Sequence, residues 1–439
     1  MQPEIRRVVI FESDPRGHAR EWLTHILKAA ERQGLRNRMV LLVARELADV
    51  LPVPLTGGAD VVALSEGEQR LCNTGSAFQR GMAKWRVVRR LARRIGVDGA
   101  FFLSLDHLLA PLALGCGLGK NTSVTGILFR PTAHYDAFEG GTGGAEAWLK
   151  QRIKRDFVVR ALRNPALSTL MSLDPYFPDY AQRHLPGGGK VVPIDDPAPT
   201  MPALAPEAVE TRRPGRTAFL LFGEITERKG ALQLLQALHQ APVSLLRQIE
   251  VSIAGRIDSG LEERFYRLLR ELEWGRPDAM VHVEDRWASD TELADRLTRT
   301  DIVLAPYQNF VGSSGVLIRA AQYRKPVICQ GFGLLGQLVR DFGLGIATDT
   351  SDPSRLAQAL EIAAEDRLQG TACAARFQDF LNNREAETFG NRVLEAAFSG
   401  NHNTTLRLPS LNADGLVEPE KMVTGVPRLV TRMAGRLVK

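Results

Sequence analysis

The sequence predicts an α/β protein built from two doubly wound domains. Short apolar runs alternate with amphipathic helical patterns along most of the 439 residues. The same alternation starts again after residue 215, and a proline-rich stretch at 193–215 separates the two series. Strand–helix alternation of this length is typical of parallel sheets that carry helices on both faces.

The first half contains six short apolar runs, typical of strands that are buried on both faces of a parallel sheet. These predicted strands are Val8–Phe11, Met39–Val43, Val61–Leu64, Gly99–Leu103, Val124–Leu128 and Thr169–Leu173. The helical patterns between them include Arg20–Gln33, Phe78–Ile95 and Ala145–Leu162. We therefore expect a Rossmann-like domain over residues 1–195.

The second half repeats this order. Its predicted strands are Ala218–Phe222, Glu250–Ala254, Met280–Val283, Ile302–Ala305, Val327–Cys329 and Leu344–Ala347. Its predicted helices are Ala231–Gln240, Leu261–Leu272, Thr291–Thr298, Val316–Tyr323 and Ser354–Ala364. The remaining segments complete the predicted organisation: a proline-rich linker at 196–215, a second Rossmann-like domain at 216–380, a terminal helix at 381–398 and a loose basic tail at 399–439.

Composition excludes several classes of protein. Hydrophobic residues make up 44% and charged residues 24%, which excludes disordered and collagen-like chains. No apolar run approaches the roughly 20 residues of a membrane-spanning helix, and the N-terminus lacks a signal-peptide core. The four cysteines form no CxxC pair: Cys72, Cys116, Cys329 and Cys373. This pattern favours a reducing cytoplasm and argues against a zinc site.

Two loops of the first domain are candidate sites, because ligands of open α/β sheets bind at the carboxyl ends of strands. After the first strand, Gly17 permits close backbone approach, with Arg16 and His18 beside it at a helix start. This loop is equally well explained as a plain turn with a surface histidine.

The loop after Val124–Leu128 gathers Arg130, His134 and Tyr135. A guanidinium binds phosphate or carboxylate in bidentate fashion, and an imidazole transfers protons near neutral pH. We favour a functional role here over a hydrogen-bonded loop cluster.

The loop Phe222–Gly230 joins the first strand and first helix of the second domain. Gly223 allows the backbone to turn, and Arg228 and Lys229 place cations at the strand end. These cations and a helix N-terminus would together stabilise a phosphate leaving group. The alternative is a solvated basic turn.

A fourth loop, Val311–Val316, contains Gly312, Ser313, Ser314 and Gly315 directly before a helical pattern. Its free amides, small hydroxyls and helix dipole predict a phosphate or oxyanion cradle. N-capping of the helix by Ser313 or Ser314 is compatible with that role. The sequence has no HxxxH pair, GxxxxGK[ST] loop or GxSxG elbow, so we expect no metal.

Several motifs of the second half resemble the donor domain of GT-B glycosyltransferases, in particular the family 4 (group 1) class. They lie in order over residues 218–364: Phe222–Gly230, Val251–Gly255, Asp301–Pro306, Ala320–Val327, Gly343–Ala347 and Asp352–Leu360. A weaker resemblance joins Phe129–Tyr135 and Ser172–Tyr176 to the acceptor domain of some bacterial members. The resemblance implies two Rossmann-like domains that face a central cleft.

Three positions depart from the family pattern. Glu224 occupies the position of a family arginine, and Arg228 is the nearest substitute cation. Val311 and Arg319 occupy the positions of two family glutamates that contact the donor sugar and the ribose.

The resemblance implies a metal-independent, retaining transfer with a nucleotide-sugar as substrate and no cofactor. It implies that Lys229 binds the donor diphosphate and that His18 and His134 are further catalytic candidates. The implied donor-binding residues are Gly17, Gly223, Arg228, Lys229, Gly312, Ser313, Ser314, Gly315 and Arg319. The implied acceptor-side residues are Arg16, Arg130 and Tyr135.

Two predicted helices, Arg80–Ile95 and Trp148–Arg163, are basic and amphipathic, and so is Val426–Lys439. Basic side chains of this kind bind an anionic membrane at up to about 1 kcal/mol each. The alternative for the two internal helices is a solvated face over domain core. Nucleic acid is not expected, because aromatic side chains do not interleave with the basic ones.

We therefore expect a cytoplasmic glycosyltransferase, peripheral at the inner face of the membrane, that transfers a sugar from a nucleotide-sugar to a glycan or lipid-linked acceptor. Two alternatives stay open. One is a nucleotide-sugar epimerase or hydrolase on the same fold. The other is a non-catalytic GT-B protein that binds a glycan, a nucleotide or a partner enzyme, which Glu224, Val311 and Arg319 motivate.

Overall fold

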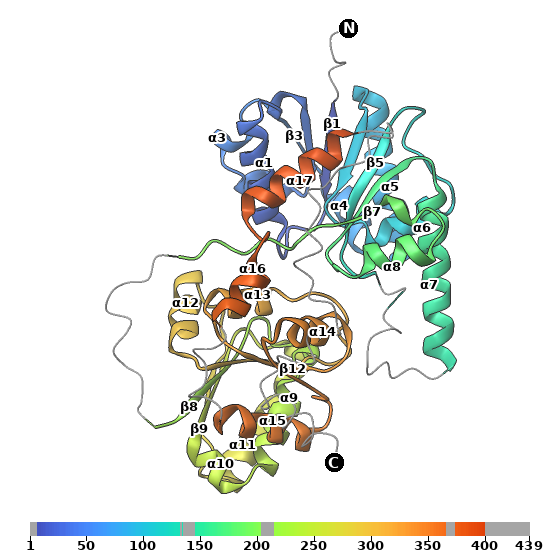
Figure 1. Ribbon diagram of the computed structural model, residues 1–439. Coiled ribbons are helices and arrows are strands. Elements are labelled where there is room, and N and C mark those ends of the chain that lie inside the picture. The colour runs from blue at the N-terminus through green and yellow to red at the C-terminus, as the bar shows by residue number, and fades with distance from the viewer. Residues whose placement is uncertain (1–6, 132–133, 135–144, 203–214, 366–373, 400–439) are drawn as a thin grey trace. The chain divides into compact units, whose positions relative to one another are not determined.

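The computed structural model describes residues 7–131, 134, 145–202, 215–365 and 374–399. Within these residues the chain forms two parallel sheets with helices on both faces, which confirms the predicted α/β class (Figure 1). Tyr135 and Cys373 lie outside the described residues, as do 203–214 of the predicted linker and all of the predicted basic tail after Ser399.

The first sheet has seven parallel strands in the order β3-β2-β1-β4-β5-β6-β7. Their bounds are β1 Val8–Glu12, β2 Met39–Val43, β3 Asp60–Ala63, β4 Gly99–Phe102, β5 Ser123–Leu128, β6 Leu167–Ser172 and β7 Val191–Pro193. The helices are α1 Ala19–Arg32, α2 Arg45–Val50, α3 Val53–Thr56, α4 Glu66–Asn73, α5 Ala77–Ile95, α6 Leu109–Ala113, α7 Ala145–Arg163 and α8 Phe177–His184. The seventh strand is not predicted from the sequence, because its three residues end on Pro193.

Alternate residues of the central strands enter two separate cores. Val9 and Phe11 pack under α4–α8, whereas Val8 and Ile10 pack under α1, α2 and a helix from the end of the chain. The prediction that every strand is buried on both faces is wrong for β3, where Val61 is exposed. This strand forms the edge of the sheet and has a neighbour on one side only.

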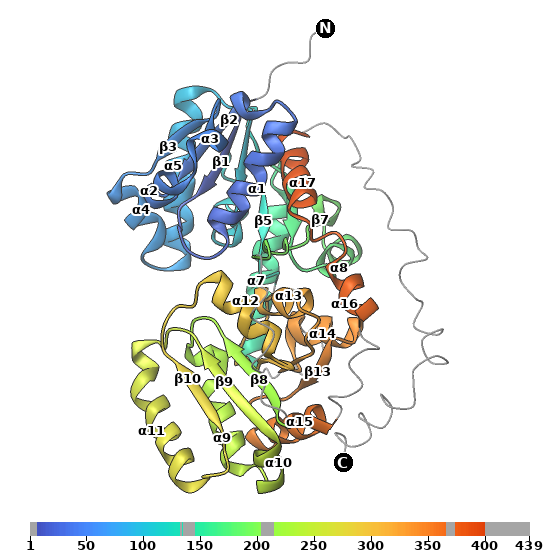
Figure 2. The same ribbon diagram turned by 90° about the vertical axis from the view of Figure 1, so that its left-hand side faces the viewer.

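The second sheet has six parallel strands in the order β10-β9-β8-β11-β12-β13. Their bounds are β8 Thr217–Phe222, β9 Ile249–Ala254, β10 Val281–Glu284, β11 Ile302–Ala305, β12 Val327–Gln330 and β13 Gly345–Thr348. The helices are α9 Ala231–Gln240, α10 Val243–Gln248, α11 Ser259–Gly275, α12 Asp290–Arg299, α13 Gly315–Gln322, α14 Gly333–Phe342 and α15 Pro353–Glu365. In Figure 2, α11 lies alongside β9 and β10.

Two helices follow, α16 Ala374–Leu381 and α17 Ala386–Ser399, and they pack against different sheets. Phe377 and Phe380 of α16 enter the core of the second sheet. Phe389 and Val393 of α17 enter the core of the first sheet, where α17 lies against α1 (Figure 1). The chain therefore returns to its first domain at the end of the described part.

Candidate functional site

Lys229 is held by the loop between β8 and α9. The short helix Glu227–Lys229 ends at Gly230, which has a φ of 74° and begins α9. The Lys229 side chain is only 7% exposed, and its Nζ donates to the Phe222 carbonyl at 3.1 Å and to the Tyr307 hydroxyl at 2.9 Å. An ammonium has three donors, so one N–H is left for a ligand.

Tyr307 connects this lysine to the loop after β11. Its hydroxyl lies 3.0 Å from the Ser314 hydroxyl, and Ser314 also accepts a hydrogen bond from the Val316 amide, which caps α13. The Arg228 guanidinium lies over the Tyr307 and Phe310 rings, at 5.3 and 4.7 Å from their centroids. The sequence interpretation did not select Tyr307 or Phe310, although both follow a strand at the carboxyl edge of the sheet.

Two glycines allow close backbone contacts of the β8 loop: Gly230 of this loop lies against the loop after β11, and Gly255 of the loop after β9 lies against Gly223. A Cβ added to Gly230 would lie 1.9 Å from the Pro306 carbonyl oxygen, and one added to Gly255 would lie 1.9 Å from the Gly223 oxygen. Gly223 has a φ of 96°, and a Cβ there would lie 3.3 Å from Lys229 Nζ. The β8 loop and the β11 loop are therefore packed backbone against backbone around the ammonium group.

The loop after β11 that was predicted to bind phosphate leads directly into α13. Gly312 and Ser314 are buried, Ser313 is half-buried, and Gly315 is the first residue of α13. This arrangement aims the N-terminus of an eight-residue helix at the same edge of the sheet as Lys229.

His18 of the first domain lies beside this helix start. A Cβ on Gly315 would be 3.4 Å from the imidazole Cε1 of His18. His18 is exposed and stacks on Trp22, and Gly17 before it has a φ of 69°. The structure therefore brings His18 and Gly315 together, as placement at opposing strand ends predicts.

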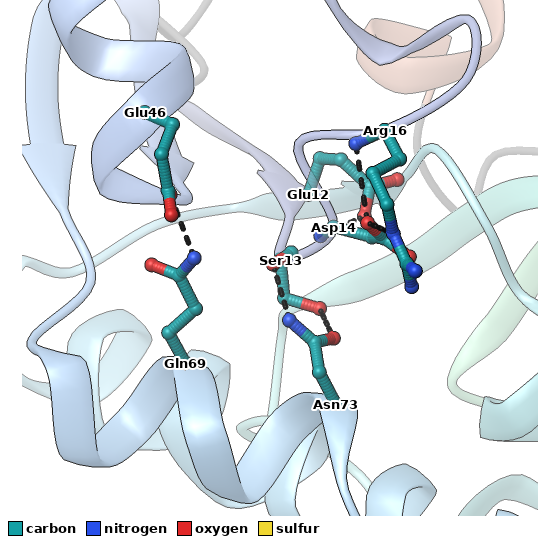
Figure 3. Close-up of polar contacts among 7 residues, drawn as sticks. All are labelled: Glu12, Ser13, Asp14, Arg16, Glu46, Gln69 and Asn73. Atoms are coloured by element: carbon teal, nitrogen blue, oxygen red, sulfur yellow. Dashed lines mark hydrogen bonds and ion pairs between the residues drawn. The ribbon is translucent and has the colours of Figure 1, made fainter. Parts of the chain in front are cut away.

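Arg16 instead contacts its own loop. Its Nε and Nη2 both donate to the Asp14 carboxylate at 3.0 Å, and its side chain is largely exposed (Figure 3). Arg130 points toward the second domain: its guanidinium lies 5.9 Å from the Phe310 ring centroid, and a Cβ on Gly312 would meet its Cγ at 3.6 Å.

His134 is enclosed within the first domain. Its side chain is 3% exposed, its Nδ1 lies 2.8 Å from the Pro131 carbonyl and its Nε2 lies 3.1 Å from Asp174 Oδ2. The Phe177 and Tyr180 rings cover it. A histidine with both nitrogens engaged and no exposed edge is placed to stabilise the loop, rather than to exchange protons with a substrate.

Arg319 lies on α13, where its Nη2 donates to Asp290 Oδ1 at 3.1 Å. Val311 is half-buried beside the apolar core of the second sheet, and Glu224 is exposed. A carboxylate is therefore present beside Arg319, but it comes from Asp290 of α12 and not from the positions of the two family glutamates.

Asp196 is a further polar group that the sequence interpretation missed. It is buried in the segment read as linker, and its Oδ1 has no partner among the described residues. Burial raises the pKa of its carboxyl, and the positive charges of His18 and Arg384 act in the opposite direction. Asp196 and His18 are thus close enough to interact electrostatically.

The part of the chain that the structure describes contains no cluster of three or more metal-ligating side chains. Cys72, Cys116 and Cys329 are free thiols. None of the described helices combines the length and apolarity of a membrane-spanning segment.

The chain is similar to one family model and to several solved structures. Residues 216–366 match the family model for glycosyl transferases group 1. No curated protein matches the chain. Similar solved structures include HepE of Anabaena in complex with UDP, at 15% identity and a TM-score of 0.61, covering 89% of this chain and 98% of that one.

Two further structures resemble nearly the whole chain. WaaG, a glycosyltransferase involved in lipopolysaccharide biosynthesis, is 14% identical with a TM-score of 0.61, covering 90% of this chain and 100% of that one. The sucrose-phosphate synthase of Thermosynechococcus elongatus is 15% identical with a TM-score of 0.66 and the same coverage. The chain thus has the GT-B fold, and its second domain carries the glycosyl transferases group 1 signature, which confirms the resemblance drawn from the sequence.

Proposed function

We propose that this protein is a glycosyltransferase that moves a sugar from a nucleotide-sugar to an acceptor, with retention of configuration and without a metal. One observation carries the proposal. The buried ammonium of Lys229 lies against Gly223 and the Tyr307–Ser314 pair, with the α13 N-terminus beside them. Such a group compensates the charge of a departing diphosphate in a site with little water.

The mechanism follows from the positions of these groups. The donor diphosphate binds between the β8 and β11 loops, where Lys229 and the Gly312–Gly315 amides are available. As the bond from sugar to phosphate breaks, negative charge grows on the leaving oxygen and interacts most strongly with the fixed ammonium. Gly17 and His18 lie next to Gly315 and would contact the sugar or the acceptor.

A nucleoside diphosphate screen tests the donor class. HepE was solved with UDP and with UDP-glucose, which favours a uridine donor here. We expect one of UDP, GDP, CDP, ADP and dTDP to raise the melting temperature without added metal. A ligand at 100 times its Kd contributes about 2.7 kcal/mol by mass action. If none of the five nucleotides raises the melting temperature, the non-catalytic alternative is favoured.

The acceptor is proposed to be a glycan or lipid-linked precursor, with the protein at the inner face of the membrane. Arg86, Arg89, Arg90, Arg93 and Arg94 of α5 line an open hollow of about 410 Å³. Arg90 pairs with Glu68, and the other four make no ion pair among the described residues. On α7, Ile153 and Phe157 add exposed apolar side chains to the same helical layer. This composition suits the phosphate surface of an anionic bilayer.

Cosedimentation with phosphatidylglycerol vesicles tests the membrane contact. Three basic side chains at about 1 kcal/mol each predict a loss of about 100-fold in binding for the triple variant Arg86→Ser, Arg89→Ser, Arg93→Ser. The matched control replaces the exposed Arg264, Arg267 and Arg270 of α11, which have similar helical spacing. Equal loss in both variants would show a non-specific charge effect. A loss only on deletion of Val426–Lys439 would assign the contact to the tail.

A further inference from the structure

A group of nitrogen-bearing side chains lies at the carboxyl edge of the first sheet, on α5 and on the short helix Asp106–Leu108 that follows β4. The two elements are in close contact, because a Cβ on Gly81 would lie only 2.0 Å from the His107 carbonyl oxygen. Arg80 precedes Gly81, and Lys84 follows it by almost one helical turn. Both cationic side chains therefore start from the part of α5 that touches His107.

Three nitrogen-bearing side chains in this group lack hydrogen-bond partners within the described chain. Lys84 is 5% exposed and makes no hydrogen bond, while Arg80 Nε and His107 Nδ1 are buried without a partner. Buried polar atoms are normally paired, so these side chains are able to bind a ligand with hydrogen-bond acceptors. Two of the three side chains are cationic, so a ligand with negative charge suits them best.

Arg130 joins this group from the next strand. The Asp106 carboxylate accepts hydrogen bonds from the Phe129 and Arg130 amides at 3.0 and 3.1 Å, which fixes the loop after β5 against the loop after β4. Burial and, to a smaller extent, the positive charges of Lys84, Arg80 and Arg130 together lower the pKa of His107 to about 4. His107 is thus neutral at pH 7 and surrounded by three cations.

The acids near these cations are Glu12, Asp14 and Asp106. Asp14 binds Arg16 (Figure 3). Asp106 binds two backbone amides. The Glu12 carboxylate accepts from the Asp14 amide at 2.8 Å, and burial raises its pKa while Lys84 opposes the rise. None of the three forms a hydrogen bond with Lys84, Arg80 or the His107 ring in the described part of the chain.

We propose that Arg80, Lys84, His107 and Arg130 bind a phosphoryl group carried by the acceptor. The two arginines and the lysine supply charge, and the neutral imidazole donates one hydrogen bond from Nδ1. Arg130 also lies over Phe310 of the donor-side loop, so an acceptor held here reaches the transfer site. This inference rests on the proposed function, since it names the acceptor class of the same site.

Calorimetric titration with inorganic phosphate tests the subsite. We expect binding that weakens at least tenfold in Arg80→Gln and in Lys84→Met. Arg89→Gln, on the exposed side of the same helix, should leave it unchanged. Lys229→Ala should also keep it, because that variant alters only the donor loops. The melting temperature of each variant without phosphate shows whether it is folded. If Lys84→Met does not fold, Arg80→Gln still tests the subsite.

Two further ligands identify the source of the phosphoryl group. Binding of glucose 1-phosphate that depends on Arg80 and Lys84 indicates a sugar phosphate, and such binding of dihexanoyl phosphatidic acid indicates a lipid phosphate. Phosphate binding that is lost in Lys229→Ala and kept in Lys84→Met and Arg80→Gln would overturn the proposal, as would no binding of any of the three. Nucleoside diphosphate binding is scored separately, so failure of the donor assignment is distinguishable from failure of this subsite.

Discussion

Lys229→Ala is expected to weaken binding of the nucleoside diphosphate by about 100-fold, which corresponds to about 2.7 kcal/mol. The buried ammonium is held by Phe222 and Tyr307 and has one N–H directed to no protein group that the structure describes. Its loss would remove the proposed charge-assisted hydrogen bond to phosphate at a site where water is largely excluded. Isothermal titration calorimetry of the wild type and the variant measures the effect.

The matched control is Lys325→Ala. Lys325 also belongs to the second domain and donates to a backbone carbonyl, that of Thr298 at 3.1 Å, but it lies after α13 and away from the β8 loop in sequence. It should keep full affinity. If Lys229→Ala binds the nucleotide as tightly as the control does, the diphosphate is not bound by this lysine.

Gly230→Ala is expected to destabilise the second domain strongly. A Cβ at this position would lie 1.9 Å from the Pro306 carbonyl oxygen, in addition to the cost of an alanine at a φ of 74°. We expect a loss of about 3 kcal/mol or more, and at 2–4 °C per kcal/mol a melting temperature lower by about 6–12 °C. The displaced loop would also move Lys229 and weaken nucleotide binding.

Gly34→Ala separates the clash from the backbone strain. Gly34 has a φ of 65° and no heavy atom within 4 Å of an added Cβ. Its substitution therefore costs only the left-handed strain, about 1 kcal/mol. Differential scanning calorimetry compares the two variants. Equal shifts in melting temperature would mean that the close contact between Gly230 and Pro306 does not constrain the loop.

Local sequence pattern predicts the elements of this fold well, because a strand in the interior of a parallel sheet is apolar on both faces. Met39–Val43 and Ile302–Ala305 are observed with the predicted bounds, and other strands differ by one or two residues. The pattern does not predict that α17 covers the first sheet after α16 has covered the second. Both helices are amphipathic, and the local sequence of neither helix indicates which of the two cores it packs against.

For the candidate site, too, some features are predicted from the sequence and others are not. Strand ends at one edge of a sheet predict that the Lys229 loop and the Ser314 loop lie together, and the Tyr307 hydroxyl does connect them. His134 has the residue type and loop position of a catalytic group, yet Asp174 and two aromatic rings enclose it. The residues that enclose it lie about 40 positions further along the chain, so the sequence of the loop alone does not predict the enclosure.

The fate of the donor sugar tests the proposed glycosyl transfer most directly. Purified protein is incubated with radiolabelled UDP-glucose, or with the sugar of whichever nucleotide the screen identifies, in the presence of bacterial membrane lipids. We expect release of the nucleotide with the label in a lipid or glycan product, and loss of both in Lys229→Ala. Nucleotide binding with no donor consumed would contradict the proposed transfer and favour a non-catalytic protein. Recovery of the label only as free sugar or as an epimer would assign hydrolysis or epimerisation instead.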